Sequence, residues 1–416
     1  MDSGTELNMA TDAPAHPGEG PLSIVTVTTL FPNPVQPVHG IFVETRLQKL
    51  LASGGVVARV IAPVPWLPPF VKYPSLGPLR QVPERAVRRG VVVVHPRYFV
   101  IPKIGMTVTP YTLYSAMHGA LRRMLDSGYR VDMIDAHYFY PDGVAAVWLA
   151  RKFGLPVTVT SRGTDLNLIP EYAVPRKMIQ RAAAAADGLI TVCEALKSRL
   201  VELGTAAERI VVLRNGVDLE LFRPTNRERA RREFGFTRPT IGSIGHLVER
   251  KGHHHIIRAL TDLPGMDLII VGAGPEHDAL QRLATRTGVG DRVRFLGAVD
   301  QQKLSTIYNA LDALVLASSR EGWANVLLEA MACGTPVVAS PVWGTPEIVA
   351  APEAGVLMPS ADEQGVVAGV TRLFKQLPRR EATRRYAEAF NWDATSRGQR
   401  ELFQDILRRR KSVPNG

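Results

Sequence analysis

The sequence predicts an α/β protein with two doubly wound lobes, each built on a parallel sheet, that face one another across a cleft. Two observations lead to this prediction. Short apolar and β-branched runs of strand length alternate with helical patterns along most of the chain. With 416 residues, the chain is also long enough for two domains that each bury a core.

We expect four segments along the chain. Residues 1–20 are polar and are expected to be disordered. Residues 21–220 and 221–390 are the two predicted lobes, joined near residues 214–218, where an Asn-Gly turn favours left-handed backbone. Residues 391–416 are predicted to form a last helix that ends in a basic tail, which would either touch acidic lipid or lie in solvent.

The composition of the chain limits the classes of protein to which it can belong. The formal net charge of +11 suits an anionic ligand or an acidic membrane surface. Nucleic acid would fit this charge equally well, but we find no helix-turn-helix, RNP-like or zinc-finger pattern and expect no nucleic-acid partner. The two cysteines, Cys193 and Cys333, do not indicate a disulfide framework. We find neither a secretory signal nor an apolar run of membrane-spanning length, so we expect a cytoplasmic protein.

The first lobe opens with a predicted strand at residues 24–30, a proline-containing loop and a helix at residues 41–51. Gly40 lies at the start of that helix, where a residue without a side chain lets backbone approach a phosphate. A simple turn would explain this glycine equally well.

Residues 63–83 form a proline-rich stretch with Trp66, Phe70 and Tyr73, and arginines follow it. Apolar and basic side chains together are typical of a surface that touches a membrane. The alternative is a loop folded on its own lobe. A helix is predicted at residues 111–125.

Two strand ends of the first lobe carry polar residues. His137 follows a predicted strand at residues 132–136 and precedes three aromatic residues, so it could bind a ligand or be structural. A strand at residues 157–160 ends in the run 161–165, which contains Arg162, Gly163 and Asp165.

The second lobe is predicted to begin with a strand at residues 240–244, followed by a loop that ends in Lys251-Gly252. A fixed cation in such a loop could stabilise the negative charge that develops on a departing diphosphate. The turn after a strand at residues 268–271 is only weakly Rossmann-like. The three histidines at 253–255 point in different directions on a helix, which argues against a shared metal.

The stretch 313–349 reads as strand, polar bend, helix and strand, a parallel α/β unit that places ligands at the carboxyl ends of its strands. Glu321 and Glu329 flank the bend and the first turns of the helix. Their carboxylates could accept hydrogen bonds from sugar hydroxyls. As a lone pair they could equally be a helix cap and a solvent-facing side chain.

A glutamate, seven residues, then a second glutamate, followed by AMACGTPVVAS and PEIV, resembles the signature of retaining nucleotide-sugar glycosyltransferases of family 4. Their fold, called GT-B, has two Rossmann-like lobes and a C-terminal helix that crosses back to the first lobe. The run HGIFVETRL resembles the N-terminal loop of bacterial cell-surface polysaccharide members. The two runs together look most like exopolysaccharide or teichuronic-acid-type enzymes.

The resemblance implies roles for individual residues. Lys251, with Arg250 or His246, would hold the donor diphosphate, Glu329 the ribose and Glu321 the donor sugar. Glu321, Lys251 and His137 would form the catalytic set. The donor-binding residues would be Gly40, Gly245, His246, Arg250, Lys251, Gly272, Gly274, Asn325, Val326, Leu327 and Glu329, and the acceptor-side residues Arg162, Gly163 and Asp165.

The chain departs from the family's pattern at two of these positions. His246 stands where the family has arginine, and Arg162 stands where it has histidine. The first departure leaves open whether Arg250 takes over at the diphosphate, and the second leaves the acceptor contact open.

The implied activity is transfer, with retention, from a UDP- or GDP-sugar to a lipid-linked or polysaccharide acceptor in cell-envelope biosynthesis. The enzyme would be cytoplasmic, with a peripheral contact to acidic membrane as a further expectation, and would need no metal or cofactor. The alternatives are a nucleotide-sugar-binding protein without transfer activity, and a GT-B epimerase or phosphorylase.

Overall fold

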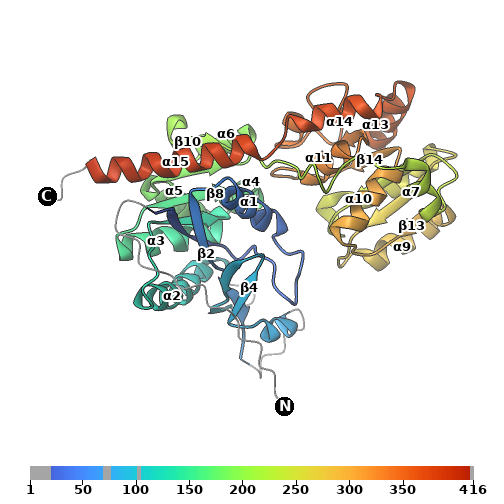
Figure 1. Ribbon diagram of the computed structural model, residues 1–416. Helices are drawn as coiled ribbons and strands as arrows, with labels where there is room; N and C mark the ends of the chain where they lie inside the picture. Colours follow the sequence, from blue (N-terminus) through green and yellow to red (C-terminus); the bar gives the residue numbers. More distant parts are fainter. Residues whose placement is uncertain (1–19, 69–75, 101–104, 413–416) are drawn as a thin grey trace, which may run out of the picture.

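The computed structural model describes residues 20–68, 76–100 and 105–412, and within these ranges the chain forms two lobes (Figure 1). The first lobe contains an eight-stranded sheet, in which every neighbouring pair is parallel except β4 and β5. Its strands, in spatial order, are β10 (Ile210–Val212), β9 (Gly188–Thr191), β8 (Val157–Ser161), β7 (Met133–His137), β1 (Leu22–Val27), β2 (Val56–Ile61), β5 (Val91–Val94) and β4 (Arg85–Arg88).

The second lobe contains a six-stranded sheet that is parallel throughout its described strands. These strands, again in spatial order, are β13 (Val293–Phe295), β12 (Asp267–Val271), β11 (Thr240–Ile244), β14 (Ala313–Leu316), β15 (Val337–Ala339) and β16 (Gly355–Leu357). The prediction of two doubly wound parallel lobes is therefore confirmed.

Helices connect the strands and cover the sheets. Those of the first lobe are α1 (Ile41–Ala52), α2 (Gly105–Asp126), α3 (Val144–Phe153), α4 (Thr164–Asn167), α5 (Ala173–Ala185) and α6 (Glu194–Glu202). Those of the second lobe are α7 (Arg227–Phe234), α8 (His253–Ala259), α9 (His277–Arg286), α10 (Gln301–Ala310), α11 (Asn325–Ala332), α12 (Thr345–Ile348), α13 (Glu363–Lys375) and α14 (Arg380–Glu388).

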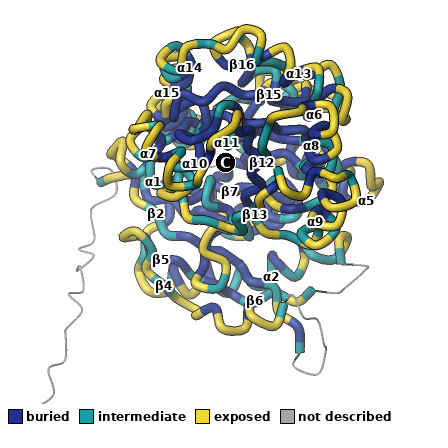
Figure 2. The backbone as a smooth tube through the Cα atoms, turned by 90° about the vertical axis from the view of Figure 1, so that its right-hand side faces the viewer, coloured by how far each residue is buried: buried dark blue, intermediate teal, exposed yellow. Residues whose placement is uncertain are grey.

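The sheets form the core of each lobe. Strands β7, β8 and β9 are buried along their whole length, and so are β14 and β15, as the continuous apolar runs of the sequence require for strands covered on both faces. Figure 2 shows β7 and β15 in dark blue inside the molecule, with exposed residues gathered on the outer helices and loops. Apolar burial of this extent is the main stabilising term of both lobes.

The last helix, α15 (Asp393–Ser412), leaves the second lobe and lies along the first (Figure 1). Its Phe403 and Ile406 are buried in one apolar cluster with Ile24 of β1 and Leu47 of α1. This confirms the predicted crossing. At its basic end Arg410 pairs with Asp187, with 3.2 Å between Nε and Oδ1, so part of the tail is held by the protein itself.

The two connections between the lobes touch one another. The amide of Val217, in the first connection, donates to the carbonyl of Phe390 in the second at 2.8 Å. Gly216 packs so closely on this second connection that a Cβ atom at its position would lie 2.7 Å from the carbonyl carbon of Asn391. The chain therefore crosses between the lobes twice at one place.

Several predicted elements differ from the structure. The helix predicted at residues 111–125 begins at Gly105 and contains Pro110. Part of the proline-rich stretch is a strand, β3 (Val64–Trp66), which pairs with β6 (Arg97–Phe99). Residues 1–19, together with Phe70 and Tyr73 of the proline-rich stretch, lie outside the described residues. None of the described helices is both long and apolar enough to cross a membrane.

Candidate functional site

A cavity of about 420 Å³ lies between the two lobes, at the carboxyl ends of strands from both sheets. Arg162 directly follows β8 on the first lobe, and Glu321 lies in the loop after β14 on the second. This is the position at which parallel α/β sheets hold ligands. The lining residues are Leu30, Phe42, Tyr138, Arg162, Gly163, Thr164, Asn167, Asn215, Arg250, Lys251, Arg320, Glu321, Gly322, Trp323, Ala324, Asn325 and Val326.

Lys251 and Glu321 form an ion pair in this cavity. The Lys251 ammonium lies 2.6 Å from Oε1 of Glu321, and the same oxygen accepts a hydrogen bond from the Ser318 hydroxyl at 2.7 Å. Only 13% of the Lys251 side chain and 8% of the Glu321 side chain are exposed. The structure therefore brings together two residues that the sequence places 70 positions apart.

Arg250, rather than His246, lines the cavity. It belongs to the short helical turn η6 (Glu249–Lys251), which follows β11. His246 is exposed and is not among the lining residues, although its carbonyl accepts a hydrogen bond from the ring of His253. Arg320, which was not predicted, supplies a further guanidinium at the cavity. The cations Arg250, Lys251 and Arg320 make the second-lobe wall strongly positive.

Glu329 lies one turn into α11 and lines an adjoining cavity of about 320 Å³, which shares Phe42 and Asn325 with the first. The Tyr308 hydroxyl on α10 donates to Oε2 of Glu329 at 2.9 Å. Burial raises the pKa of Glu329 to about 7, an effect that the Tyr308 hydrogen bond partly offsets. The carboxylate is thus poised to change its charge near neutral pH.

At the start of α11, two backbone amides are already hydrogen-bonded within the turn. The amide of Asn325 donates to the carbonyl of Trp323 at 3.1 Å, and that of Leu327 donates to Ala324 at 3.0 Å. Asn325 and Val326 line the cavity, whereas Leu327 is fully buried and does not. The amide of Leu327 is thus already engaged within the turn, and the donor-binding role of Leu327 stays a prediction.

The glycines predicted to bind the donor shape the loops of the site rather than line the cavity. A Cβ at Gly272 would lie 1.8 Å from the carbonyl oxygen of Gly245, and one at Gly274 would lie 2.3 Å from that of Leu247. These glycines therefore let the loops after β11 and β12 pack backbone to backbone. Gly40, at the start of α1, similarly packs on the backbone of Leu30.

His137 is buried behind the cavity. Its Nδ1 accepts a hydrogen bond from Nη2 of Arg162 at 2.6 Å, and its Nε2 lies 3.1 Å from Oδ2 of Asp135. Burial lowers the pKa of His137 to about 4, so the ring is neutral at pH 7 and its Nε2–H donates to Asp135. His137 is not among the residues that line the cavity, and proximity to a reacting sugar stays a prediction.

Arg162 does line the cavity and joins the two lobes. Its Nη1 donates to Oδ1 of Asn215 at 3.0 Å, and Nδ2 of Asn215 lies 3.3 Å from Oδ1 of Asn325 on the second lobe. The indole of Trp323 donates to the carbonyl of Asn215 at 3.0 Å. Asn215 therefore connects the acceptor-side arginine to the start of α11.

Asp165 holds the loop that carries Arg162. Its carboxylate accepts hydrogen bonds from the amides of Phe139, Arg162 and Gly163 at 2.6–3.0 Å. It is fully buried and does not line the cavity, so its acceptor-side role stays a prediction and the structure shows it supporting the loop instead. Gly163 lines the cavity and meets the second lobe, since a Cβ there would lie 3.0 Å from the backbone of Gly322.

A buried polar network supports the site from below, and sequence reasoning missed most of it. Arg46 of α1 donates to Gln399 of α15 at 2.8 Å and to the carbonyl of Leu213 at 2.9 Å. Gln399 in turn donates to Oδ2 of Asp135 at 3.1 Å. The sequence did contain one signal of this network. Arg46 is a charged residue in the middle of an apolar helix pattern.

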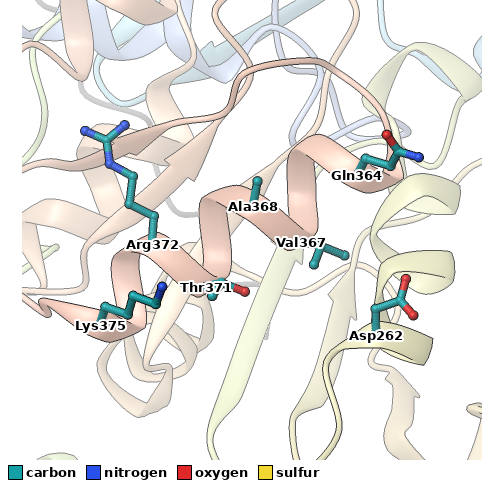
Figure 3. Close-up of a pocket in the computed structure, with 7 residues that line it drawn as sticks. All are labelled: Asp262, Gln364, Val367, Ala368, Thr371, Arg372 and Lys375. Atoms are coloured by element: carbon teal, nitrogen blue, oxygen red, sulfur yellow. The ribbon is translucent and has the colours of Figure 1, made fainter.

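A separate hollow lies on the outside of the second lobe, between α13 and the turn η7 (Leu260–Asp262) (Figure 3). Its lining residues are Asp262, Gln364, Val367, Ala368, Thr371, Arg372 and Lys375. None of the predicted site residues belongs to it.

Two family models match the chain, one for each lobe. The model described as Glycosyltransferase Family 4 matches residues 45–221, and the model described as Glycosyl transferases group 1 matches residues 225–390.

Two similar curated proteins are both named D-inositol 3-phosphate glycosyltransferase. The chain is 32% identical over 309 residues to the D-inositol 3-phosphate glycosyltransferase of Mycobacteroides abscessus, and the match covers 69% of each chain. It is 30% identical over 368 residues to the enzyme of that name from Thermobispora bispora, covering 80% of this chain and 85% of the other. The sequence motifs led us to expect an exopolysaccharide or teichuronic-acid enzyme. The names of these relatives do not support that expectation.

Solved structures share the fold. Sucrose-phosphate synthase from Thermosynechococcus elongatus matches with a TM-score of 0.76 at 20% identity, over 93% of this chain and 100% of that one. HepE of Anabaena in complex with UDP-glucose matches with a TM-score of 0.68 at 18% identity, over 94% and 100%. Both likenesses concern the arrangement of the two lobes.

Proposed function

Because the chain belongs to the glycosyltransferases of group 1 and Family 4, we propose that it moves a sugar from a UDP- or GDP-sugar to a hydroxyl of an acceptor, with retention at the anomeric carbon. The observation that carries the proposal is the inter-lobe cavity, where three cations of the second lobe stand beside Glu321. A nucleoside diphosphate sugar offers the matching chemistry, which is a doubly charged diphosphate joined to a ring of hydroxyls.

Each charged residue of the site has a proposed role in the transfer reaction. Lys251, Arg250 and Arg320 stabilise the negative charge that gathers on the departing diphosphate. Glu321 accepts hydrogen bonds from hydroxyls of the donor sugar, and Glu329 accepts them from the ribose in the adjoining cavity. The leaving phosphate takes the proton of the acceptor hydroxyl, so that the new glycosidic bond forms on the face from which the phosphate departs.

The first acceptor to test is an inositol phosphate, because curated relatives that match two thirds or more of the chain bear that name. A lipid-linked or polysaccharide acceptor is the second candidate. It is favoured by exposed aromatic side chains on the first lobe: Trp66 is 38% exposed, Phe99 42% and Tyr111 55%. A hollow lined by Trp66 and Phe99 also contains Arg97, Arg123 and Glu84. Because Glu84 pairs with Arg123 at 3.6 Å, the net positive charge of these residues corresponds to one arginine. For such an acceptor the enzyme would work in the cytoplasm against acidic membrane.

Thermal shift with UDP, GDP, ADP and their common sugars tests the donor site. We expect one nucleotide to stabilise the wild-type protein and to lose most of this effect in Glu329→Ala. The responding donor is then incubated with inositol 3-phosphate or with a lipid-linked glycan, and the glycosylated product is measured. Tight donor binding without transfer to either acceptor would favour a binding protein, and an altered sugar released without acceptor would favour an epimerase.

A further inference from the structure

We propose that Arg162 binds an oxyanion of the substrate, a carboxylate or a phosphate, at the first-lobe wall of the cavity. This inference rests on the proposed function and adds a substrate class to it. The site is distinct from the diphosphate site, whose cations come from the second lobe. Arg162 comes from the end of β8 and is 8% exposed, and it lines the cavity opposite Lys251 and Glu321.

The hydrogen-bond partners of Arg162 are neutral. Nη1 donates to the Asn215 amide oxygen and Nη2 to Nδ1 of the neutral His137, while Nε has no partner. Among the described residues, no carboxylate lies within ion-pair distance of this guanidinium. Such a buried charge is costly unless a counter-charge reaches it.

The acidic groups nearest to Arg162 are committed elsewhere. Asp165 accepts three backbone amides of its own loop. Asp135 accepts from Gln399 and Thr158 and faces His137, and it also lies near Arg46, a second buried cation. Two carboxylates, Asp135 and Asp165, and two guanidiniums, Arg46 and Arg162, therefore share this region, but neither carboxylate contacts the guanidinium of Arg162 directly. An anionic ligand in the cavity would supply that direct contact.

The network also fixes how the guanidinium is presented. Asn215 and His137 each hold one terminal nitrogen, and the ring of Phe42 lies 5.5 Å from the guanidinium carbon. A guanidinium held in this way has N–H groups left over for oxygen atoms, and its planar fork suits carboxylates and phosphates. A neutral hydroxyl would leave the guanidinium without a directly bonded anionic partner, so selection for an acidic substrate is expected.

The oxyanion has two sources, which an experiment separates. It is either the carboxylate of a uronic acid on the donor or a phosphate on the acceptor. Isothermal titration of the wild-type protein compares UDP-glucuronate with UDP-glucose, and GDP-mannuronate with GDP-mannose. A second arm, with nucleotide bound, compares inositol 3-phosphate with inositol. We expect the acidic member of one pair to bind about tenfold more tightly or better, as a hydrogen bond to a charged group requires.

The variant Arg162→Gln keeps a donor for His137 but removes the charge, and we expect it to abolish that preference. Arg162→Lys should keep part of it, and Arg229→Gln, at an exposed arginine of α7, should change nothing. Equal affinities within every pair in the wild-type protein would overturn the inference without using any variant. Binding of UDP or GDP in that case would leave the proposed function standing, whereas the loss of all nucleotide binding would count against the proposed function itself.

Discussion

The ammonium group of Lys251 lies 2.6 Å from Oε1 of Glu321, so the cation assigned to the donor diphosphate is paired with the carboxylate assigned to the donor sugar. Both side chains are almost completely buried. A bound donor offers each of them a new partner, the phosphate for Lys251 and the sugar hydroxyls for Glu321. The pair thus keeps two charges compensated until the substrate replaces them.

Replacing Lys251 with alanine should lower kcat/KM for transfer by about 10²- to 10³-fold, because one fixed cation at the developing phosphate charge is lost. Initial rates at several donor concentrations would measure this. The control is Lys152→Ala, which removes an exposed lysine of α3 and should leave the rate unchanged. Near-normal turnover of Lys251→Ala would remove Lys251 from the catalytic set.

Donor affinity should rise with pH across neutrality, because the pKa of Glu329 is raised to about 7 and its ionised form accepts hydrogen bonds from ribose. The ionised fraction grows from about 0.1 at pH 6 to about 0.9 at pH 8, so Kd should fall by up to about tenfold. Titration calorimetry with a nucleotide sugar is suitable, since its diphosphate diester does not titrate in this range. Glu329→Gln should give a weaker and pH-independent Kd, and an unchanged slope in this variant would assign the titration to another group.

Replacing Arg46 with methionine should destabilise the protein by about 3 kcal/mol, because it breaks a buried hydrogen-bonded network and leaves Asp135 short of positive charge. Chemical denaturation measures the free energy of unfolding. Arg229→Met, at an exposed position of α7, provides the matched control. A change of less than about 0.5 kcal/mol in Arg46→Met would show that the network contributes no net stability.

Gly322→Ala should impair sugar transfer, because the added methyl group would disturb a close contact between the two lobes. A Cβ at this position would lie 1.9 Å from the carbonyl oxygen of Arg162, so the loops that carry Arg162 and Glu321 must move apart. We expect weaker donor binding and a lower kcat. Gly290→Ala, in the turn before β13, is the control, since the nearest atom to a Cβ there would be the Cα of Thr285 at 3.6 Å. Wild-type kinetics in Gly322→Ala would show that the close approach is not needed for activity.

The sequence predicted what depends on local pattern. Alternating apolar runs marked most strands of both sheets, and the spacing of Glu321 and Glu329 identified the loop and helix that form the second-lobe side of the site. The weaker predictions were those that depended on the direction in which a side chain points. His137 and Asp165 follow or flank strand ends as expected, but their side chains turn into the protein, where backbone amides and Arg162 occupy them.

The supporting network could not be predicted, because it depends on distant parts of the chain. Asp135 and Gln399 are 264 positions apart, and Arg46 and Gln399 are 353 apart. No periodicity links such residues. Asn215 was taken as part of a connecting turn, yet its position between the lobes lets it contact both Arg162 and Asn325.

The two crossings of the chain between the lobes meet at Val217 and Phe390. Two neighbouring points of attachment define an axis, and rotation about that axis is the motion they resist least. Opening would therefore widen the cavity most at the end farthest from these crossings, while the base near Asn215 changes little. Because α15 fastens the end of the chain to the first lobe, a protein shortened before residue 393 would keep only one attachment, and its lobes would lose their common axis.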